Sequence, residues 1–344
     1  MTEIPLCRFP RASRLLLLSG YTASMRDMDE TQPEISAVIC TWNRTELLRG
    51  ALESFSKQTL PVNNWELIVV CNNSPEDTRR AVLDAQSACD YRLILIDEPR
   101  QGKSFALNAA LAAARAPVIA CTDDDCRPAP DWLQRIVNRF AASEVGLLGG
   151  PGLSVFGPDV AADPRRLFLG QRFLGDYRPY EEFVEIGRDN PPLGLNLSFR
   201  AEVARVIGGF NPDLGPVLTR HLGREETDFV RRAQAAGFRV FYDPDVVVSH
   251  HVESERVNGE AIIRMAFEGG VGVYRERYQN SAGRPGRRLE LALRFALEYC
   301  YALARLIVFA PSYRRRMVAR FRLTSAAGKL SALRRLRGQI PGAG

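Results

Sequence analysis

The chain has 344 residues, enough for one large α/β domain with an appendage or for two domains. Its hydrophobic share of 46% and charged share of 25% are those of an ordinary globular protein. No apolar run approaches the roughly 18 residues that a membrane-spanning helix needs. The run Leu15–Leu18 is also too short for the apolar region of a signal peptide.

The net charge of +6 is unevenly distributed along the chain. From Arg284 onward there are thirteen arginines and one lysine against two glutamates, a net charge of +12, so residues 1–283 carry −6. The protein is therefore an acidic body with a basic tail, and such a tail attracts anionic surfaces.

The seven cysteines are odd in number and include no Cys-x-x-Cys pair. Three of them, Cys40, Cys71 and Cys121, end strand-like apolar runs, where a free cysteine behaves as a small buried hydrophobe. A disulfide scaffold or a zinc site is therefore not expected, and this cysteine usage favours the reducing cytoplasm.

Short, β-branched apolar runs alternate with helical patterns in the first half of the chain. The expected strands are Ile35–Cys40, Glu66–Cys71, Arg92–Ile96 and Pro117–Cys121, and the expected helices are Leu47–Phe55, Thr78–Ala88 and Phe105–Ala114. This alternation predicts an α/β fold with a mostly parallel sheet and helices on both faces. Ligands of such sheets bind beyond the carboxyl ends of the strands.

Beyond Gly149 the pattern is less regular. Gly146–Val155 is predicted to be extended, and residues 157–190 are predicted to form a long loop with a short helix. The elements expected after them are a helix over Arg224–Ala236 that ends at Gly237, and short strands at Arg239–Tyr242 and Val246–Ser249.

The most informative motif is Asp123-Asp124-Asp125, which follows the apolar run Pro117–Cys121. Because side chains alternate along a strand, Asp123 and Asp125 are expected on one side and Asp124 on the other. Two carboxylates that converge at the carboxyl end of a strand suit Mg²⁺ or Mn²⁺, which could hold a diphosphate. The alternative is a solvated acidic turn.

Further motifs stand in order around the aspartates. They are Thr41-Trp42-Asn43-Arg44 after the first strand, Asn72-Asn73-Ser74 after the second, Gly102-Lys103-Ser104 at a helix start, Glu225-Glu226-Thr227-Asp228 farther along, and His250 after the last strand. Over roughly residues 35–252, this order and spacing resembles the family 2 glycosyltransferases of the GT-A fold.

The resemblance implies a Rossmann-like GT-A domain over residues 34–255, with a nucleotide-sugar-binding half (34–126) and an acceptor half (127–255). A loose N-terminal extension (1–33) and a basic, amphipathic helical region (256–344) flank it. The implied reaction moves a sugar from a nucleotide-diphosphate sugar to an acceptor hydroxyl with inversion. Processive relatives carry a Gln-x-x-Arg-Trp motif and transmembrane helices, which are not found in this sequence, so transfer of a single sugar is expected.

The resemblance also implies individual site residues. A divalent cation, Mg²⁺ or Mn²⁺, would be held by Asp125, Asp123 and His250 and would stabilise the diphosphate leaving group. The residues implied in donor binding are Thr41, Asn43, Arg44, Cys71, Asn72, Asn73, Gly102, Lys103, Asn108, Asp123 and Asp124, and Asn196 is implied on the acceptor side. Plain alternatives are a strand-end His250 bonded to backbone and a solvated surface Lys103.

An acceptor hydroxyl needs a general base, and Glu226 occupies the second place of the family's Glu-Asp motif. Glu225 is the second candidate. Alternatively, both acids only complement the dipole at a helix start. Asp228 and Arg232, four residues apart on the same helix, are expected to form a structural ion pair.

One position departs from the family. The second strand usually ends in an Asp that reads the uracil ring of a UDP-sugar, whereas Cys71 stands here. A thiol is a much weaker hydrogen-bonding group than a carboxylate, so Asn72 or Asn73 would have to substitute for it. A UDP-sugar remains the expected donor.

The segment 289–337 combines an apolar-aromatic helix with basic helices. It could lie on an anionic membrane surface and bring the site to a lipid-linked or glycan acceptor, or it could pack on the acidic body. No motif supports nucleic-acid binding. The expected location is the cytoplasm, with peripheral contact to the inner face of the cell membrane, and the expected role is in surface polysaccharide or glycolipid biosynthesis.

Two other functions stay open at this point. A nucleotidyltransferase or nucleotide-sugar pyrophosphorylase would share the sheet and the metal, but Thr41–Arg44 stands where its Gly-rich phosphate loop is expected. A non-catalytic carbohydrate- or membrane-binding module on a GT-A body would show no metal-dependent nucleotide binding. Cys71 is the residue that favours this last function.

Overall fold

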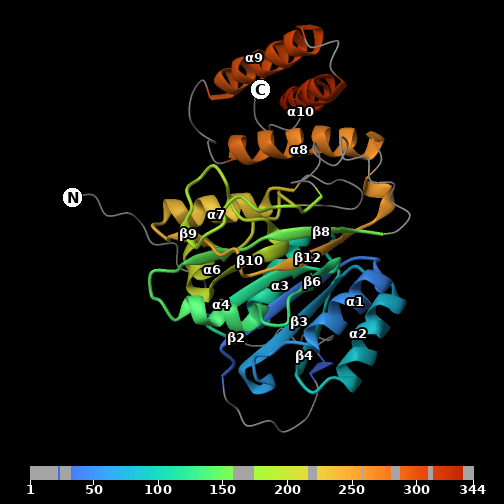
Figure 1. Cartoon of the computed structure of the whole chain (residues 1–344), viewed down its shortest axis with the longest axis vertical. Helices are drawn as coiled ribbons and strands as arrows, with labels where there is room; N and C mark the ends of the chain where they lie inside the picture. The colour runs from blue at the N-terminus through green and yellow to red at the C-terminus, as the bar shows by residue number, and fades with distance from the viewer. Residues whose placement is uncertain are drawn as a thin grey trace, which may run out of the picture.

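The computed structural model describes residues 22–23, 32–157, 174–215, 223–257, 259–279, 287–308 and 313–335. These residues form an α/β body on which three long C-terminal helices are stacked (Figure 1). Parts of the predicted N-terminal extension and of the predicted loop over residues 157–190 lie outside the described residues.

Within the described residues, nine strands form the main sheet. They are β1 (Thr22–Ala23), β2 (Ile35–Thr41), β3 (Trp65–Asn72), β4 (Arg92–Glu98), β5 (Val118–Asp123), β7 (Leu147–Gly149), β9 (Val184–Glu185), β10 (Leu197–Arg200) and β11 (Val240–Tyr242). Their order across the sheet is β1-β4-β3-β2-β5-β10-β7-β11-β9.

The predicted parallel strands β4, β3, β2 and β5 are neighbours and run parallel. Their nearly uninterrupted apolar sequences suit strands that are covered on both faces. The register pairs Thr41 with Cys71 and Cys40 with Asp123, so the carboxyl ends of β2, β3 and β5 lie together. Polar residues that follow these strands therefore meet at one edge of the sheet.

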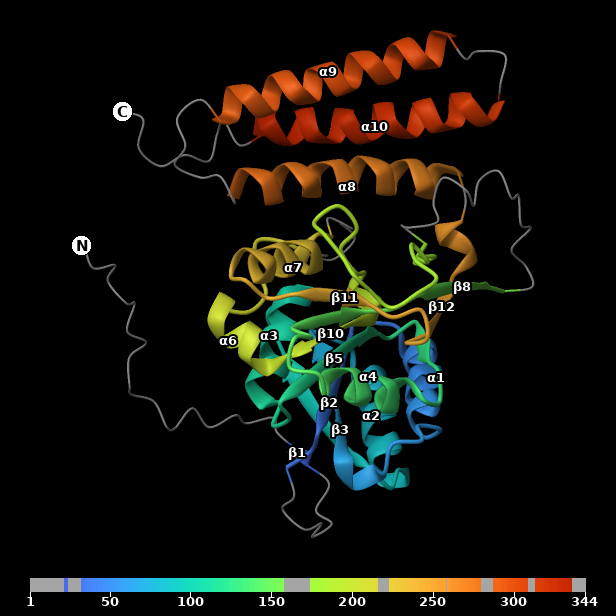
Figure 2. The same cartoon turned by 60° about the vertical axis from the view of Figure 1, so that its left-hand side comes forward.

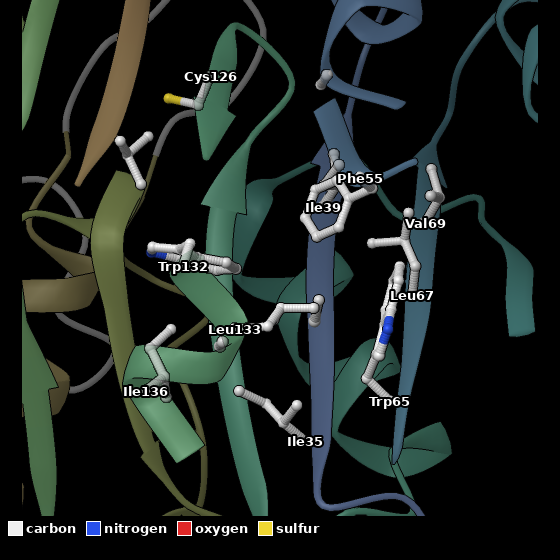
Figure 3. Close-up of a cluster of buried hydrophobic side chains, with 14 of the residues drawn as sticks. Ile35, Ile39, Phe55, Trp65, Leu67, Val69, Cys126, Trp132, Leu133 and Ile136 are labelled. Atoms are coloured by element: carbon white, nitrogen blue, oxygen red, sulfur yellow. The ribbon is translucent and has the colours of Figure 1, made fainter. Parts of the chain in front are cut away.

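Helices cover both faces of this sheet, as predicted. One face packs against α1 (Thr45–Phe55), α2 (Glu76–Ala88) and α4 (Trp132–Phe140), and the other against α3 (Lys103–Ala113), α6 (Ala201–Ile207) and α7 (Glu225–Ala235). Figure 3 shows the first face, where Phe55 lies beside Ile39 of β2 and Trp132 lies farther along the sheet, over β5 and β10. Helices α1, α2 and α3 directly follow β2, β3 and β4, so their N-termini lie at the edge where the parallel strands end.

Strand β10 runs antiparallel between β5 and β7, an arrangement that the sequence pattern did not indicate. The 3₁₀ turn η2 (Gly194–Asn196) leads into it, and Thr122 Oγ1 donates a hydrogen bond of 2.8 Å to the carbonyl oxygen of Leu195. A four-residue strand is too short to show a periodicity. Its insertion brings η2 to the carboxyl end of β5.

A second, three-stranded sheet has the order β6-β12-β8. Its strands are β6 (Cys126–Pro128), β8 (Gly152–Phe156) and β12 (Val248–Val252). The predicted extended segment Gly146–Val155 is divided between β7 and β8. His250 was expected after the last strand, but it lies at the centre of β12, because the turn at Asp243–Val246 delays the start of that strand.

Three long helices, α8 (Gly259–Gln279), α9 (Arg287–Val308) and α10 (Tyr313–Arg335), follow the short 3₁₀ turn η3 (Ser254–Arg256). Figure 2 shows them stacked above the body, with α8 nearest to it and α9 farthest away. Ile262 and Met265 of α8 pack against buried side chains of the body, including Val252. The predicted helical appendage is therefore docked on the body through α8.

Two glycines allow α8 and α10 to pack closely. A Cβ on Gly270 would lie 2.0 Å from the carbonyl oxygen of Ser325, and a Cβ on Gly328 would lie 2.0 Å from that of Phe267. The backbones of the two helices are therefore in direct contact, and neither glycine tolerates a side chain without movement of a helix.

None of the helices within the described part of the chain combines the length and the apolar character needed to cross a membrane. The cysteines that the structure describes are all free thiols.

Candidate active site

A cavity of about 480 Å³ opens at the edge where the parallel strands end. The ends of β2 and β5, the first residues of α3 and α7, η2 and β12 all contribute to its wall. The predicted residues that line it are Thr41, Asn43, Arg44, Asn72, Lys103, Asp123, Asp124, Asp125, Glu225, Glu226 and His250. The topology thus gathers most of the predicted site, from segments far apart in the sequence, around one cavity.

The aspartate triplet does not keep the alternation expected of a strand. β5 ends at Asp123, and Asp124 and Asp125 lie in the turn that leads to β6. Thr41 Oγ1 donates to Asp124 Oδ2 (2.8 Å), and Arg44 Nη1 contacts Asp124 Oδ1 (3.3 Å) and Asp125 Oδ2 (2.9 Å). Asp124 therefore faces the same guanidinium as Asp125, because the chain leaves the extended conformation before Asp124.

The two buried aspartates of this turn have opposite pKa shifts. Burial, followed by the charge of Asp125, raises the pKa of Asp124 to about 7. Burial would also raise the pKa of Asp125, but the hydrogen bond with His250 and the charges of Arg44 and Arg256 hold it well below its usual range. Asp125 is thus the aspartate that remains ionised and suits a cation.

The small sheet holds His250 next to Asp125. The register of β12 on β6 pairs His250 with Cys126, the residue that follows Asp125. His250 Nδ1 lies 2.6 Å from the carbonyl oxygen of Leu174 and donates to it, so Nε2, 3.2 Å from Asp125 Oδ2, faces the carboxylate. An imidazole oriented by a backbone carbonyl and placed beside a carboxylate suits a metal-binding pair.

Asp123 does not join this pair, because its Oδ1 accepts a hydrogen bond of 2.5 Å from Lys103 Nζ. Within the described ranges, no group of three or more His, Cys, Asp or Glu side chains is close enough together to hold a metal ion. Asp125 and His250 instead fit a Mg²⁺ or Mn²⁺ site that takes few protein ligands and is completed by phosphate oxygens. The structure brings two of the three predicted ligands together.

Lys103 connects the acidic groups on the two sides of the cavity. Its Nζ bonds Asp123 and lies 3.9 Å from Glu225 Oε1. Burial alone would lower the pKa of Lys103, but Asp123 and Glu225 raise it well above its usual value. Lys103 is therefore a charged group of the cavity wall rather than a solvated surface lysine.

Glu225 and Glu226 begin α7 and differ in their surroundings. Burial, followed by the charge of Glu226, raises the pKa of Glu225 to about 8, and no other described residue donates a hydrogen bond to its Oε2. Glu226 is the more exposed of the two and packs on η2, where a Cβ on Gly194 would lie 3.4 Å from the Glu226 Cβ. The wall at Gly194 leaves room for the Glu226 side chain in the cavity.

The predicted ion pair between Asp228 and Arg232 is present, with 2.7 Å between Oδ2 and Nε. Arg232 also donates to the carbonyl oxygens of Ile207 and Gly209, each at 2.7 Å. The pair therefore ties α7 to the end of α6 and has a structural role.

Asn108 and Asn196 do not line the cavity. The Asn108 amide accepts from the N–H of Phe210 and donates to its carbonyl oxygen, each at 2.8 Å. Asn196 Nδ2 donates to the carbonyl oxygens of Pro151 (3.0 Å) and Val246 (2.7 Å). Both amides hold loops behind the cavity wall, which satisfies buried backbone groups.

Cys71 is buried outside the cavity wall, and burial raises the pKa of its thiol to about 12. Asn72 Nδ2 donates to the carbonyl oxygens of Glu98 (3.1 Å) and Arg100 (2.7 Å), and its Oδ1 accepts from the N–H of Gly102 (2.8 Å). Asn72 therefore fixes the loop before α3, and its amide is already engaged there rather than free to replace the family's Asp. Gly102 belongs to this loop, where its N–H bonds Asn72, and it does not line the cavity.

Positive φ angles of residues other than glycine occur, within the described ranges, at Asn43 (+52°), Asn73 (+50°) and Arg224 (+81°). Asn43 and Arg224 line the cavity, and Asn73 bonds the cavity residue Gln101 through its Nδ2 (3.0 Å). Asparagine tolerates this conformation, whereas arginine rarely adopts it. The strain of the backbone is thus concentrated around the cavity, as is typical of functional sites.

The sequence did not single out several residues of the wall. Trp42 belongs to the first motif and Arg256 follows β12, while Gly175 lies in an irregular segment. Arg256 Nη1 is 3.2 Å from Asp125 Oδ2 and 3.5 Å from His250 Nε2. An arginine so soon after His250 was the one local signal that could have marked this position.

Comparisons with known proteins show which proteins this chain is similar to. The model of glycosyl transferase family 2 matches residues 36–196, a range that contains the parallel strands and the aspartate triplet. Glycosyltransferase AglE from Haloferax volcanii is 26% identical over 223 residues, which are 65% of this chain and 68% of that protein. The glucosyl-dolichyl phosphate glucuronosyltransferase of the same organism is 27% identical over 242 residues (68% and 74%), and the succinoglycan biosynthesis protein ExoM from Rhizobium meliloti is 24% identical over 234 residues (67% and 71%).

Solved structures show the same fold. The mannosyltransferase PcManGT from Pyrobaculum calidifontis, in complex with GDP-Man and Mn²⁺, has a TM-score of 0.59 at 19% identity and covers 88% of each chain. Residues 1–349 of TarS from S. aureus, in complex with UDP, have a TM-score of 0.50 at 16% identity and cover 89% of this chain and 92% of that one. The body of the chain therefore has the GT-A fold.

Proposed function

We propose that this chain, a family 2 glycosyltransferase over its matched residues 36–196, moves a single sugar from a nucleotide-diphosphate sugar to an acceptor hydroxyl with inversion. The main observation behind this proposal is that three kinds of chemical group line the same cavity. Asp125 with His250 suits a cation, Arg44 and Lys103 are cationic, and Glu226 is an accessible carboxylate. Transfer from a diphosphate leaving group needs all three.

The diphosphate half of the cavity lies at the ends of β2 and β5. Arg44 and Lys103 supply positive charge there, and Lys103 also begins a helix whose N-terminus favours phosphate. Asp125 and His250 would hold Mg²⁺ or Mn²⁺, which supplies stabilisation of the charge that develops on the leaving diphosphate. The Mn²⁺ in the PcManGT structure supports this choice of cofactor.

Glu226 is proposed as the general base that takes the proton of the acceptor hydroxyl. A carboxyl group whose pKa is about 8, like that of Glu225, is mostly protonated at neutral pH and cannot accept a proton there. Glu226 is the more exposed of the two and lines the same cavity. The buried Glu225, mostly protonated at this pH, then acts mainly through its contact with Lys103.

The donor is proposed to be a UDP-sugar. TarS was solved with UDP and PcManGT with GDP-Man, so relatives of the same fold use different bases. Because Cys71 is buried outside the cavity wall and the amide of Asn72 is bonded to the loop before α3, the aromatic face of Trp42 is the remaining wall group near β2 that suits stacking on a base. An aromatic ring stacks on any base, so the nucleotide panel described below tests the choice of UDP.

The acceptor is proposed to be a lipid-linked sugar or a glycan in surface polysaccharide or glycolipid biosynthesis. The names of the relatives, which include a dolichyl phosphate glucuronosyltransferase and a succinoglycan biosynthesis protein, support this class. The outermost helix α9 exposes Leu293 (59%), Leu297 (71%) and Tyr301 (59%), and the sequence from Arg284 onward is strongly basic. These features support peripheral contact of residues 289–337 with the inner face of the cell membrane from the cytoplasm.

The test is calorimetric binding of UDP, GDP, dTDP, ADP and CDP with and without Mn²⁺. We expect one nucleotide to bind with an affinity that Mn²⁺ increases, and we expect Asp125→Ala to remove that increase. The exposed Asp245, which pairs with Arg135 outside the cavity, provides the control variant Asp245→Ala, whose binding should equal that of the wild type. Binding by none of the nucleotides would contradict the proposal, and pyrophosphate release from a nucleoside triphosphate would favour a nucleotidyltransferase instead.

A further inference from the structure

Glu276 of α8 is a buried carboxylate that contacts the start of α7. Its side chain is only 1% exposed. Its Oε2 accepts hydrogen bonds from Arg224 Nη2 (2.8 Å) and Nε (3.1 Å), and its Oε1 accepts one from Arg231 Nη1. Figures 1 and 2 both show α8 lying directly over α7, so this contact joins the C-terminal helices to the body.

Arg224 is the residue immediately before the glutamates of the cavity. Its φ of +81° is one that a residue with a side chain rarely adopts. Its carbonyl oxygen accepts the N–H of Asp228 (2.9 Å), the first hydrogen bond of α7. The conformation of Arg224 therefore sets the direction in which Glu225 and Glu226 leave the preceding loop, and this conformation needs an external contact to hold it.

The position of Glu276 is fixed from the other side of α8. Gly270 and Gly328 bring the backbones of α8 and α10 into direct contact, so α8 cannot move independently of α10. Gly269, the neighbour of Gly270, lines the cavity itself. A continuous series of contacts thus runs from α10 through α8 to the cavity wall.

We propose that Glu276 is a positioning residue, which acts through Arg224 to hold Glu226 in place, so that the C-terminal helices complete the active site. The two hydrogen bonds from Arg224 to Glu276 Oε2 lock the Arg224 side chain, and with it the left-handed backbone at the start of α7. The inference rests on the proposed role of Glu226 as the base. It adds that a residue outside the matched family 2 range controls that base.

The chain offers a matched control for a purely structural role. Glu66 is also a fully buried carboxylate between two arginines, with its Oε2 3.1 Å from Arg115 Nε and 3.4 Å from Arg92 Nε. It lies near the start of β3, at the end of the sheet opposite the cavity. Glu66→Gln and Glu276→Gln therefore remove the same kind of ion pair at two different places.

The first measurement is hydrogen–deuterium exchange of the peptide spanning residues 224–232, with the full chain. We expect Glu276→Gln to speed exchange there several-fold, because the first turn of α7 opens more often. We expect Glu66→Gln to leave this peptide unchanged while it speeds exchange in β3. Equal exchange of residues 224–232 in Glu276→Gln and the wild type would overturn the positioning role.

The second measurement is the rate of nucleoside diphosphate release from UDP-glucose and GDP-mannose. We expect Glu276→Gln to lower kcat by about tenfold to a hundredfold, with little change in KM, since small displacements of a catalytic group have effects of this size. Glu66→Gln should keep kcat per folded molecule. If Glu276→Gln had the kcat of the wild type while Glu226→Gln had a strongly reduced kcat, only the positioning role of Glu276 would be contradicted. If Glu226→Gln also had the kcat of the wild type, the proposed function itself would be contradicted.

Two further variants apply if Glu276→Gln does not fold. Arg224→Lys keeps the charge but loses the two-pronged contact, so it should reproduce the faster exchange and the lower kcat. Arg231→Lys alters the other partner of Glu276, which does not precede the glutamates, and should keep kcat. Equal effects of the two lysine variants would show that the ion pair only stabilises the fold.

Discussion

Buried carboxylates lie at both ends of the parallel sheet, and the two ends differ in how the charges are satisfied. At the amino end, Glu66 Oε1 accepts from Ser36 Oγ (2.7 Å) and the N–H of Arg115 (2.9 Å), and its Oε2 accepts from Arg115 Nε (3.1 Å). Arg92 adds a second guanidinium at 3.4 Å. One carboxylate there meets two cations, and each of its oxygens has a partner.

At the carboxyl end, acids lie beside acids. The charge of Asp125 adds to burial in raising the pKa of Asp124, and that of Glu226 adds to burial in raising the pKa of Glu225. Among the described residues, nothing donates a hydrogen bond to Glu225 Oε2. This end of the sheet therefore keeps electrostatic repulsion that the protein does not resolve by itself.

The difference separates a structural cluster from the candidate active site. A buried carboxylate with complete partners contributes to the fold and to little else, because any ligand would have to displace those partners. An incomplete cluster in a cavity attracts what would complete it, such as a cation or a proton from a substrate hydroxyl. Buried acids alone do not mark the candidate site; acids placed next to acids, together with the unpartnered Glu225 Oε2, do.

The sharpest test of this comparison is the pair Glu226→Gln and Glu66→Gln. We expect Glu226→Gln to lower kcat by about a thousandfold while nucleotide binding stays within twofold, because loss of a general base typically costs 10²–10⁴ in rate. Glu66→Gln should have the reverse effect. It should destabilise the fold by about 3 kcal/mol, since it leaves two guanidinium groups without their anion, and it should keep kcat.

Steady-state kinetics and chemical denaturation of both variants provide the readout. A Glu226→Gln enzyme with wild-type kcat would remove Glu226 from the mechanism. A Glu66→Gln enzyme with a large loss of kcat at full folding would show that the two ends of the sheet are not functionally distinct.

A second test uses the raised pKa of Glu225. Its pKa rises from 4.5 to about 8 on folding, so between these values the folded state holds a proton that the unfolded state has released. The free energy of unfolding should therefore fall as the pH rises through this window, and Glu225→Gln should remove that part of the fall. The stability of the variant relative to the wild type should thus increase by about 1 kcal/mol per pH unit within the window.

Denaturation at several pH values from about 5 to 8 measures this difference. Asp124, whose pKa is also raised, is present in both proteins, so its contribution cancels in the comparison. If the free energy of unfolding of Glu225→Gln and of the wild type changed equally with pH, Glu225 would already be ionised in the folded protein. The acids at the carboxyl end of the sheet would then be better compensated by neighbouring charges than their geometry indicates.

The parallel core of the fold was predictable because it depends on local signals, and the same signals indicated the edge of the sheet at which the candidate site lies. The apolar runs of β2, β3 and β5 show their two-sided burial directly, and the polar residues after each run must then meet at one edge. The alternation of the aspartates was predicted wrongly, because strand ends are set by tertiary contacts. Here the bonds of Asp124 with Thr41 and Arg44 hold a turn where a strand was expected.

Other parts of the site depend on pairings that no local pattern contains. His250 reaches Asp125 only because β12 pairs with β6 in the small sheet. Asn108 and Asn196 look like site residues in sequence, but their amides satisfy distant backbone groups. The contact of Glu276 with Arg224 joins residues 52 positions apart, and the sequence gives no reason to connect them.

The mildest test changes the neighbour of His250 instead of an acid. Gly175 lines the cavity with a φ of +80°, and a Cβ there would lie 2.4 Å from His250 Nδ1, the atom that bonds the carbonyl oxygen of Leu174. Gly175→Ala should therefore turn or displace the imidazole and weaken the Mn²⁺-dependent part of nucleotide binding by about tenfold, the usual effect of losing a contact that orients a metal ligand. Gly208→Ala is the matched control, because Gly208 has a similar φ of +83° but no atom lies within 4 Å of a Cβ there, and it should bind as the wild type does. If calorimetry gave Gly175→Ala and Gly208→Ala the same Mn²⁺ dependence, His250 would not belong to the cation site, and Asp125 would have to act without it.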